Sequence, residues 1–182
     1  MILRKVVIKL IQVFSGIAIL ACYVQANSSQ IELITVKQDA GVEMLQNYLQ
    51  MRLRNADWKE YSKFITWPDE PSWDCNWVVS KYEIRTAKKE DNNFVIPVVF
   101  NRLGLFCYDY DFNQDPKEVT INYELIELPS GWKVKAPIPD YPEISADELI
   151  KALRASAEDS KETPERRARY SATARKVEKA LR

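Results

Sequence analysis

The hydrophobic pattern along this chain is helical at first, then strand-like, then helical again. Residues 41–54 carry apolar side chains every three or four positions, at Val42, Leu45, Leu49 and Leu53. This spacing predicts an amphipathic helix. A second, short helix is expected to begin at Asp57, which has the capping-box spacing to Glu60. Its aromatic stripe would start with Trp58 and Tyr61.

Alternation with a period of two begins near residue 77 and predicts an antiparallel sheet of four to five strands. The expected strands cover residues 77–85, 94–100, 106–112, 119–125 and 132–136. Asn101–Gly104 has the composition of a hairpin turn, and Asn113–Pro116 that of the next turn. Pro97 has no N–H to donate, so its strand is expected to lie at an edge or a bulge.

Two helical segments follow the strands. Ser145 and Glu148 form a capping box ahead of a third helix, whose apolar side carries Leu149, Ile150 and Leu153. Thr163–Pro164 can cap a last helix. The apolar stripe of that helix is narrow and consists of Tyr170, Ala174, Val177 and Leu181. The stripe indicates a basic helical tail over residues 159–182 that stays loose or docks on a partner.

The first 26 residues have the pattern of a secretory signal peptide. Basic residues open the chain, an apolar run covers Leu10–Val24, and Val24–Ala26 offers a cleavage site. Residues 27–38 then form a polar leader to a domain over residues 39–158. The sequence therefore predicts export, most simply to a bacterial periplasm. Ile19–Cys22 resembles a lipobox, so the alternative is a lipoprotein anchored to the membrane through Cys22.

Export bears on the redox state of the cysteines. The chain has three, and loss or acylation of Cys22 leaves Cys75 and Cys107. Two cysteines in an oxidising compartment usually form a disulfide. The pair lacks the C-x-x-C spacing of redox-active sites, so a structural disulfide is predicted.

Charge is balanced overall but is distributed unevenly. The chain has 26 Lys and Arg against 26 Asp and Glu. Residues 159–182 hold eight basic and four acidic residues, so the tail is basic and the body is acidic. A basic tail can contact an acidic membrane surface or partner, or can simply complement the body as a solvated helix. An acidic, exported body argues against nucleic-acid binding.

The composition also limits the chemistry. The chain contains no histidine, which removes Ser-His-Asp and Cys-His catalysis and most zinc sites. Asp109–Asp115 has the acidic spacing of a calcium loop. However, Gln114 stands where such a loop needs glycine, and Thr120 stands where it needs glutamate. Neither a metal nor another cofactor is expected.

Two amphipathic helices, a meander of strands and the strand opening Gly131-Trp132-Lys133-Val134 resemble the NTF2-like (cystatin-like) superfamily over about residues 39–155. The resemblance implies an α+β fold in which a curved sheet packs on the N-terminal helices as a cone. It also implies an apolar pocket or a dimer interface. The aromatic residues expected on the interior faces are the candidate ligand-binding residues, namely Trp58, Tyr61, Tyr82, Tyr123 and Trp132.

These features favour a non-enzymatic, exported domain that binds an apolar small molecule or a protein partner. Catalytic members of the superfamily, such as ketosteroid isomerases, suggest an acid–base isomerase or hydratase as an alternative. Such a site would combine a tyrosine with a carboxylate, chosen from Tyr48, Tyr61, Tyr82, Tyr123, Asp69 and Asp74. A further alternative is an immunity-type or structural protein that docks another chain through its sheet face.

Overall fold

The computed structural model describes residues 39–69, 71–90 and 93–182. The expected signal peptide, the polar leader and Cys22 lie outside the described residues. The helices and strands below belong to the compact unit that begins at Gly41, apart from the first two residues of the first helix. None of the described helices combines the length and the apolar character needed to cross a membrane.

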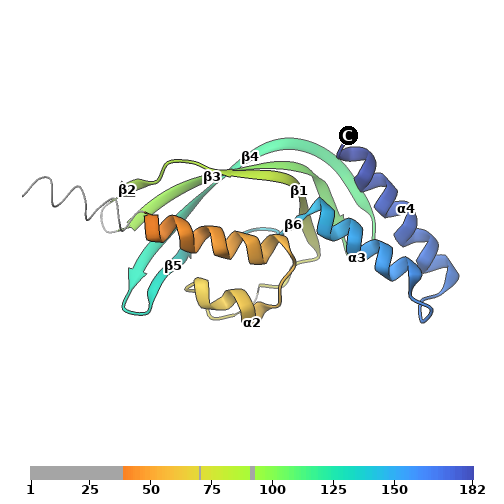
Figure 1. The fold of residues 1–182 in the computed structure, drawn as a ribbon, viewed down its shortest axis with the longest axis horizontal. Helices are drawn as coiled ribbons and strands as arrows, with labels where there is room; N and C mark the ends of the chain where they lie inside the picture. Colours follow the sequence, from red (N-terminus) through yellow and green to blue (C-terminus); the bar gives the residue numbers. More distant parts are fainter. Residues whose placement is uncertain (1–38, 70, 91–92) are drawn as a thin grey trace, which may run out of the picture. The chain divides into compact units, whose positions relative to one another are not determined.

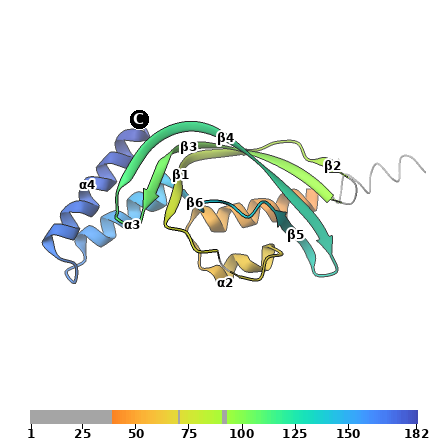
Figure 2. The ribbon, with the colours of Figure 1, turned by 180° about the vertical axis from the view of Figure 1, so that it is seen from behind.

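The predicted α+β class is confirmed. A strongly curled sheet holds the first helix (residues 39–53) on its inner side, and two further helices lie at the opposite end of the strands (Figures 1 and 2). The other elements are α2 (Trp58–Tyr61), the 3₁₀ turn η1 (Ser62–Phe64), β1 (Cys75–Ile84), β2 (Lys88–Glu90), β3 (Asn93–Cys107), β4 (Phe112–Leu128), β5 (Gly131–Ala136), β6 (Glu143–Ser145), α3 (Ala146–Glu158) and α4 (Pro164–Ala180).

The strands follow the order β5-β4-β3-β1-β6, and the short β2 pairs with β3 beyond the end of β1. All named pairs are antiparallel except β1 with β6, which are parallel. The helix over 41–54, the short second helix and the strand 119–125 are thus confirmed, the last within a longer β4. Asp57 does cap α2 by position, but its side chain makes no capping hydrogen bond.

The predicted hairpin turn at Asn101–Gly104 is wrong, because β3 continues through these residues to Cys107. Gly104 serves close packing instead of a turn. A Cβ at Gly104 would overlap the backbone oxygen of Asn113 and lie 2.9 Å from the ring of Phe112. The real turn between β3 and β4 covers residues 108–111, where Tyr110 takes a left-handed conformation with φ of 59°.

Gly104→Ala is expected to lower the free energy of unfolding by about 1–3 kcal/mol, because the added methyl group meets rigid backbone of β4. Gly41→Ala is the matched control. Its Cβ would lie at an ordinary 3.5 Å from Leu125, and alanine favours a helix by up to about 1 kcal/mol over glycine. Urea unfolding of both variants checks the prediction, and equal effects would contradict it.

The predicted turn at Asn113–Pro116 is also wrong. These residues open β4, and Pro116 lies where the β3–β4 register slips between Arg102 and Gly104. The register slip explains how a strand accommodates a proline, since a bulge leaves residues out of the hydrogen-bond ladder. Asp115 lies in this irregular stretch, and its carboxylate forms an ion pair with the guanidinium of Arg102, which is a buried residue.

Pro97 was expected at an edge or bulge, but β3 is a central strand and Pro97 lies opposite Asn122 of β4. Its carbonyl accepts a 2.8 Å hydrogen bond from the Arg85 N–H. The ring nitrogen therefore faces the same side, where β1 has ended at Ile84 and β2 begins only at Lys88. Proline is tolerated because neither β1 nor β2 pairs with β3 at this position, so the missing N–H interrupts no pairing of named strands.

A first hydrophobic core fills the space between the first helix and the sheet. Its fully buried side chains come from the first helix, from β1, β3, β4 and β5, and from Ile65 directly after η1. The largest of them are Leu45, Tyr48, Leu49, Ile65, Ile96, Phe100, Tyr123 and Leu125. The interior of the curled sheet is therefore packed with side chains at this end.

A second core joins α3 and α4 to the far end of the sheet. The predicted caps are present: Ser145 accepts from the Glu148 N–H, and Thr163 accepts from the Arg166 N–H. The expectation that the last helix stays loose or docks on a partner is wrong, because its narrow stripe packs on its own chain. The buried members of this core include Leu149, Ile150, Leu153, Tyr170, Ala174 and Val177.

The basic face of α4 meets the acidic turn between β3 and β4. Thr173 donates a 2.7 Å hydrogen bond to the Tyr110 carbonyl, and the Lys176 ammonium lies 2.7 Å from the Asp111 carboxylate. The hydrogen bond from Lys176 holds the pKa of Asp111 below its ordinary value. A basic side chain of the tail thus pairs with an acidic group of the body within the same chain.

Candidate functional site

The candidate site is built on the last turn of the first helix. Buried residues on this helix follow the spacing i, i+3, i+4, i+7, at Leu45, Tyr48, Leu49 and Arg52. Arg52 therefore falls on the face that packs against the sheet. A guanidinium at this position must find its partners inside the protein or in a cavity.

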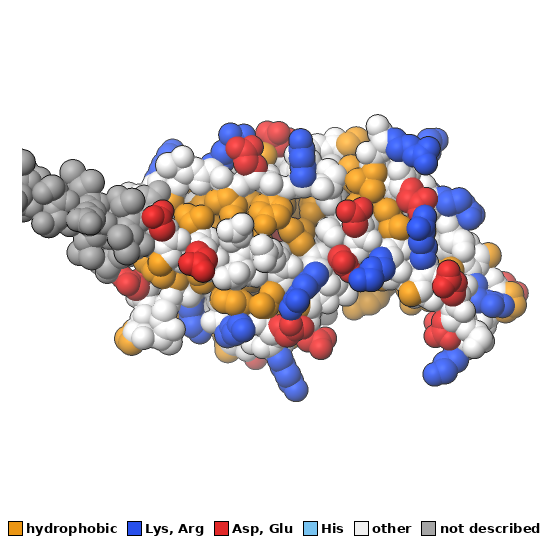
Figure 3. Space-filling view, in the orientation of Figure 1, with side chains coloured by type: hydrophobic (Ala, Val, Ile, Leu, Met, Phe, Trp, Pro, Cys, Tyr) orange, Lys and Arg blue, Asp and Glu red, His pale blue; other side chains and the backbone are white. Residues whose placement is uncertain are grey.

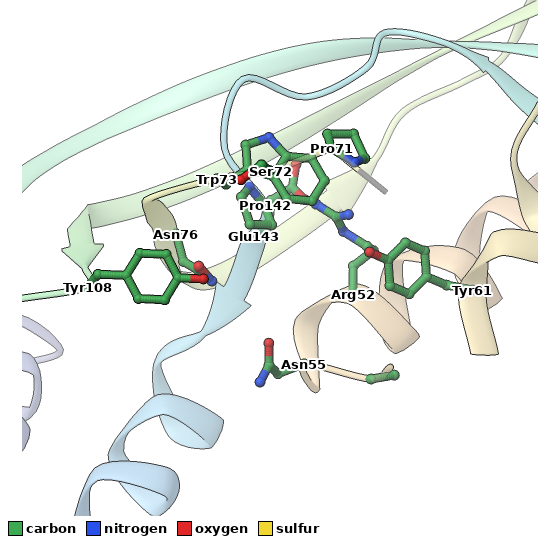
Figure 4. A pocket seen from close by; sticks show the side chains of 11 residues that line it. Arg52, Asn55, Tyr61, Pro71, Ser72, Trp73, Asn76, Tyr108, Pro142 and Glu143 are labelled. Carbon is green, nitrogen blue, oxygen red and sulfur yellow. The ribbon is translucent and has the colours of Figure 1, made fainter. Parts of the chain in front are cut away.

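A cavity of about 440 Å³ opens beside Arg52. Its wall comes from the end of the first helix and the turn after it, α2, the segment before β1, the start of β1, the β3–β4 turn and the start of β6 (Figure 4). The lining residues are Arg52, Asn55, Ala56, Tyr61, Pro71, Ser72, Trp73, Asn76, Tyr108, Pro142 and Glu143. Polar groups dominate this wall, which distinguishes it from the packed core beside it.

Two buried charges lie at the base of the pocket. Arg52 and Glu143 have side chains that are only 2% and 1% exposed, and their closest nitrogen and oxygen are 3.4 Å apart. Close charge-assisted hydrogen bonds measure about 2.7–2.9 Å. Glu143 also accepts a 3.3 Å hydrogen bond from the Tyr123 hydroxyl. The ion pair is therefore buried but loosely held.

Aromatic rings surround the Arg52 guanidinium. Its Cζ lies 5.0 Å from the ring centre of Trp73, 5.1 Å from that of Tyr61 and 5.9 Å from that of Tyr48. Figure 4 shows Arg52 reaching up from its helix between Tyr61 and Trp73. Rings at these distances stabilise a cation. They therefore help to stabilise the buried guanidinium charge, which few hydrogen bonds compensate.

Two hydrogen bonds to proline carbonyls position the Trp73 and Glu143 sides of the pocket. The Trp73 indole N–H donates a 2.9 Å hydrogen bond to the Pro139 carbonyl. The Trp77 N–H donates to the Pro142 carbonyl at 2.8 Å, which fixes β6 beside β1. The two proline-containing segments on either side of the pocket are thus tied together.

Burial shapes the electrostatics of the site. It raises the pKa of the Tyr123 hydroxyl well above its ordinary value, and Glu143 adds to the shift. Burial likewise raises the pKa of Tyr48. Burial opposes the charge on Arg52, but the neighbouring acidic groups, with Tyr48 and Glu143 foremost, together outweigh it and keep the pKa of Arg52 above its ordinary value. The site therefore combines neutral phenols with a charged guanidinium.

Beside the ion pair lies one of the three buried side-chain donors that have no partner within the described residues. The Tyr48 hydroxyl is enclosed and makes no hydrogen bond there, although its ring lies against Arg52. Most buried polar atoms are hydrogen-bonded. An unpaired hydroxyl beside a loosely held ion pair marks this region as suited to further polar contacts.

The five aromatic residues predicted to line a pocket do not form one site. Tyr61 alone lines the polar pocket, with Trp58 packed edge-on against it at 5.3 Å. Tyr123 is buried behind Glu143. Tyr82 lies on β1 along a different cavity, and Trp132 packs on Phe94.

The tyrosine and carboxylate expected for an acid–base site are only partly brought together. Tyr48, Tyr61 and Tyr123 do converge on one region, but Asp69 and Asp74 are exposed. The carboxylate in this region belongs to Glu143. Sequence reasoning missed both Arg52 and Glu143. The one usable signal was an arginine seven residues after Leu45 on the apolar stripe.

The fold and this pocket define an α+β protein with a curled sheet and a polar cavity at the end of its first helix. The chain matches no protein-family model, no curated protein and no solved structure. The NTF2-like resemblance therefore stays a prediction. Within the described ranges, no three acidic or cysteine side chains gather in a way that could hold a metal ion.

Proposed function

We propose that this chain is an exported, non-enzymatic binding domain whose pocket around Arg52 holds a small polar ligand with a carboxylate or similar acceptor group. One observation carries this proposal. The buried Arg52 guanidinium lines the cavity, and among the described residues its side chain makes a single, long hydrogen bond, to Glu143. A guanidinium offers five donors in a planar fork that suits a carboxylate.

The pocket supports a polar ligand better than the apolar one expected from the sequence. Asn55, Ser72 and Asn76 line it together with the ion pair, and they add hydrogen-bonding groups around the guanidinium. Trp73 and Tyr61 supply flat apolar surfaces beside these groups. Small-molecule sites typically combine such apolar and aromatic walls with a few placed polar groups that fix the orientation of the ligand.

Export is supported by the disulfide between Cys75 and Cys107. Disulfides persist in oxidising compartments and are rare in the cytosol. A periplasmic or otherwise exported location, with or without a lipid anchor at Cys22, remains part of the proposal. The NTF2-like class is likewise part of the proposal.

Titration with acetate and benzoate is expected to shift the indole N–H resonance of Trp73, because the acids would enter the cavity that Trp73 lines. Arg52→Lys should weaken this binding about tenfold or more, since lysine keeps the charge but loses the planar fork. The measurement is a ¹H–¹⁵N NMR titration of the indole region, with Trp73→Phe to assign the signal.

Arg54→Lys is the matched control. Arg54 lies two residues further on, pairs with Glu60 at the surface and does not line the pocket. Its variant should bind the acids as the original chain does. Equal weakening in both variants, or no shift of the Trp73 signal with either acid, would refute the proposed site.

Acid–base catalysis is the second candidate, on one observation: the buried carboxylate of Glu143 lies in the pocket wall and contacts a tyrosine hydroxyl. In such an enzyme Glu143 would take a proton from a carbon next to a carbonyl, and a phenol would donate to the carbonyl oxygen. Deuterium exchange into a small ketone, followed by NMR, tests this. Exchange that depends on Glu143, absent in Glu143→Gln, would favour the enzyme over the binding domain.

A further inference from the structure

Strand β1 carries an uncovered edge. On one side it pairs with β3 from Cys75 to Ile84, with a bulge that leaves Ser80 without a register partner on β3, and on the other β6 pairs only with Trp77, Val78 and Val79. After Ser145 the chain leaves the sheet to begin α3. From Ser80 to Ile84, no strand of the described part of the chain covers this side of β1.

The space beside this edge is open. A cavity of about 270 Å³ lies where β6 would run if it continued, lined by Leu53, Val79, Ser80, Lys81, Tyr82 and Ser145. Figure 3 shows hydrophobic side chains exposed in a band between the first helix and the strands above it. An open edge with an apolar groove beneath it is a template for another strand.

The backbone direction along β1 follows from one hydrogen bond. The Arg85 N–H donates to the Pro97 carbonyl of β3 at 2.8 Å. Peptide groups alternate in direction along a strand, so those of Lys81 and Glu83 also face β3. The N–H and C=O groups of Tyr82 and Ile84 therefore point to the uncovered side.

The charges on this edge are self-complementary. Lys81 and Glu83 are exposed, and they flank Tyr82 with opposite signs. Within the chain the Glu83 carboxylate also pairs with the exposed Arg85 guanidinium at 2.9 Å, a surface pair that contributes little stability. If two copies pair antiparallel about a two-fold axis at Tyr82, Lys81 of each copy lies opposite Glu83 of the other. These are non-hydrogen-bonded pairs, in which facing side chains approach most closely. Opposite charges placed this way stabilise the pairing of strands.

We propose that two copies of this chain associate through the β1 edges, antiparallel and centred on Tyr82, to form one continuous sheet. The two Tyr82 residues exchange both of their N–H···O=C bonds across the axis. Two Lys81–Glu83 pairs set the register, because a shift by two residues would break them. This surface is separate from the pocket around Arg52, so either proposal can fail without the other.

Substitutions that reverse the charges of Lys81 and Glu83 test the proposed strand register directly. Lys81→Glu and Glu83→Lys each place like charges opposite one another twice, and each should weaken the dimer about tenfold or more. The double variant with both changes restores two opposite-charge pairs and should recover the dimer. Lys179→Glu, at an exposed lysine of α4, is the control and should leave it unchanged. Sedimentation equilibrium measures the dissociation constants.

Hydrogen exchange followed by NMR gives a second readout that does not depend on affinity alone. Amides of Tyr82 and Ile84 should exchange slowly in the dimer and rapidly in either single variant. Amides of Lys81 and Glu83, bonded to β3, should stay protected in all. A monomer at about 500 µM, a concentration at which even a dimer of micromolar affinity would be populated, overturns the proposal. So does a dimer insensitive to the single changes, or an edge that is protected only by a different protein.

Discussion

Arg52→Met is expected to lower the free energy of unfolding by about 3–5 kcal/mol, because it leaves the Glu143 carboxylate buried without its counter-charge. Methionine fills much of the volume of arginine and still packs against the rings of Tyr61 and Trp73. The loss therefore comes chiefly from the unpaired charge. Urea unfolding followed by tryptophan fluorescence gives the value.

Adding Glu143→Gln to Arg52→Met should recover much of this loss. Glutamine is neutral and can still accept the 3.3 Å hydrogen bond from the Tyr123 hydroxyl. A buried ion pair and its neutral replacement often differ little in stability, whereas half of a pair is costly. Recovery in the double variant separates the charge effect from a simple packing defect.

Arg54→Met is the control for the same stretch of helix. The Arg54–Glu60 pair has side chains that are 53% and 48% exposed, and pairs of this kind contribute about 0–1 kcal/mol. If Arg52→Met lowers the free energy of unfolding no more than Arg54→Met does, then the Glu143 carboxylate is not a buried, unpaired charge in the Arg52→Met variant. The argument for a preformed, charged pocket would then be wrong.

Local signals in the sequence predicted the helices well. Ser145 and Thr163 cap α3 and α4 as their spacing to Glu148 and their position before Pro164 indicated. Caps of this kind depend on the three or four residues next to them, which the sequence displays directly. The first helix was predicted for the same reason, since its apolar spacing is a local property.

Turn prediction failed where a residue type served a contact between strands. Gly104 looked like a turn residue, but it is needed because β4 passes too close for a side chain. Tyr110, whose left-handed backbone makes the actual turn, carries no composition signal for it. A glycine can be needed because the backbone takes a conformation that other residues avoid, or because a neighbouring segment leaves no room for a side chain. Only the fold shows which of these two reasons applies.

The site was missed for a related reason. Arg52 and Glu143 are separated by 91 residues, and they meet only because β6 runs beside β1 near the end of the first helix. Pairing over such a distance leaves no trace in local spacing. The aromatic residues were identified, but aromatic rings occur in cores and pockets alike, so their type alone did not separate Tyr61 from Tyr82.

Replacing both Cys75 and Cys107 by alanine is expected to lower the free energy of unfolding by roughly 3–4 kcal/mol. The predicted bond between them is present and closes a loop with a sequence separation of 32, and the loss is the chain-entropy value for a loop of that length. Urea unfolding of the oxidised protein and the double variant measures the difference. The original chain treated with reductant should behave like the variant.

The same change should also loosen the pocket, because the disulfide joins the ends of β1 and β3, where Cys75 and Cys107 are register partners. Asn76 and Tyr108, two residues of the pocket wall, each follow one of the cysteines. The Tyr108 N–H donates a 3.0 Å hydrogen bond to the Asp74 carbonyl across this junction. Its amide should therefore exchange faster in the variant under conditions where the sheet is still folded, while amides of the β4–β5 pair keep their rates. A variant that unfolds at the same urea concentration and keeps the Tyr108 amide protected would mean that strand pairing alone holds this wall in place.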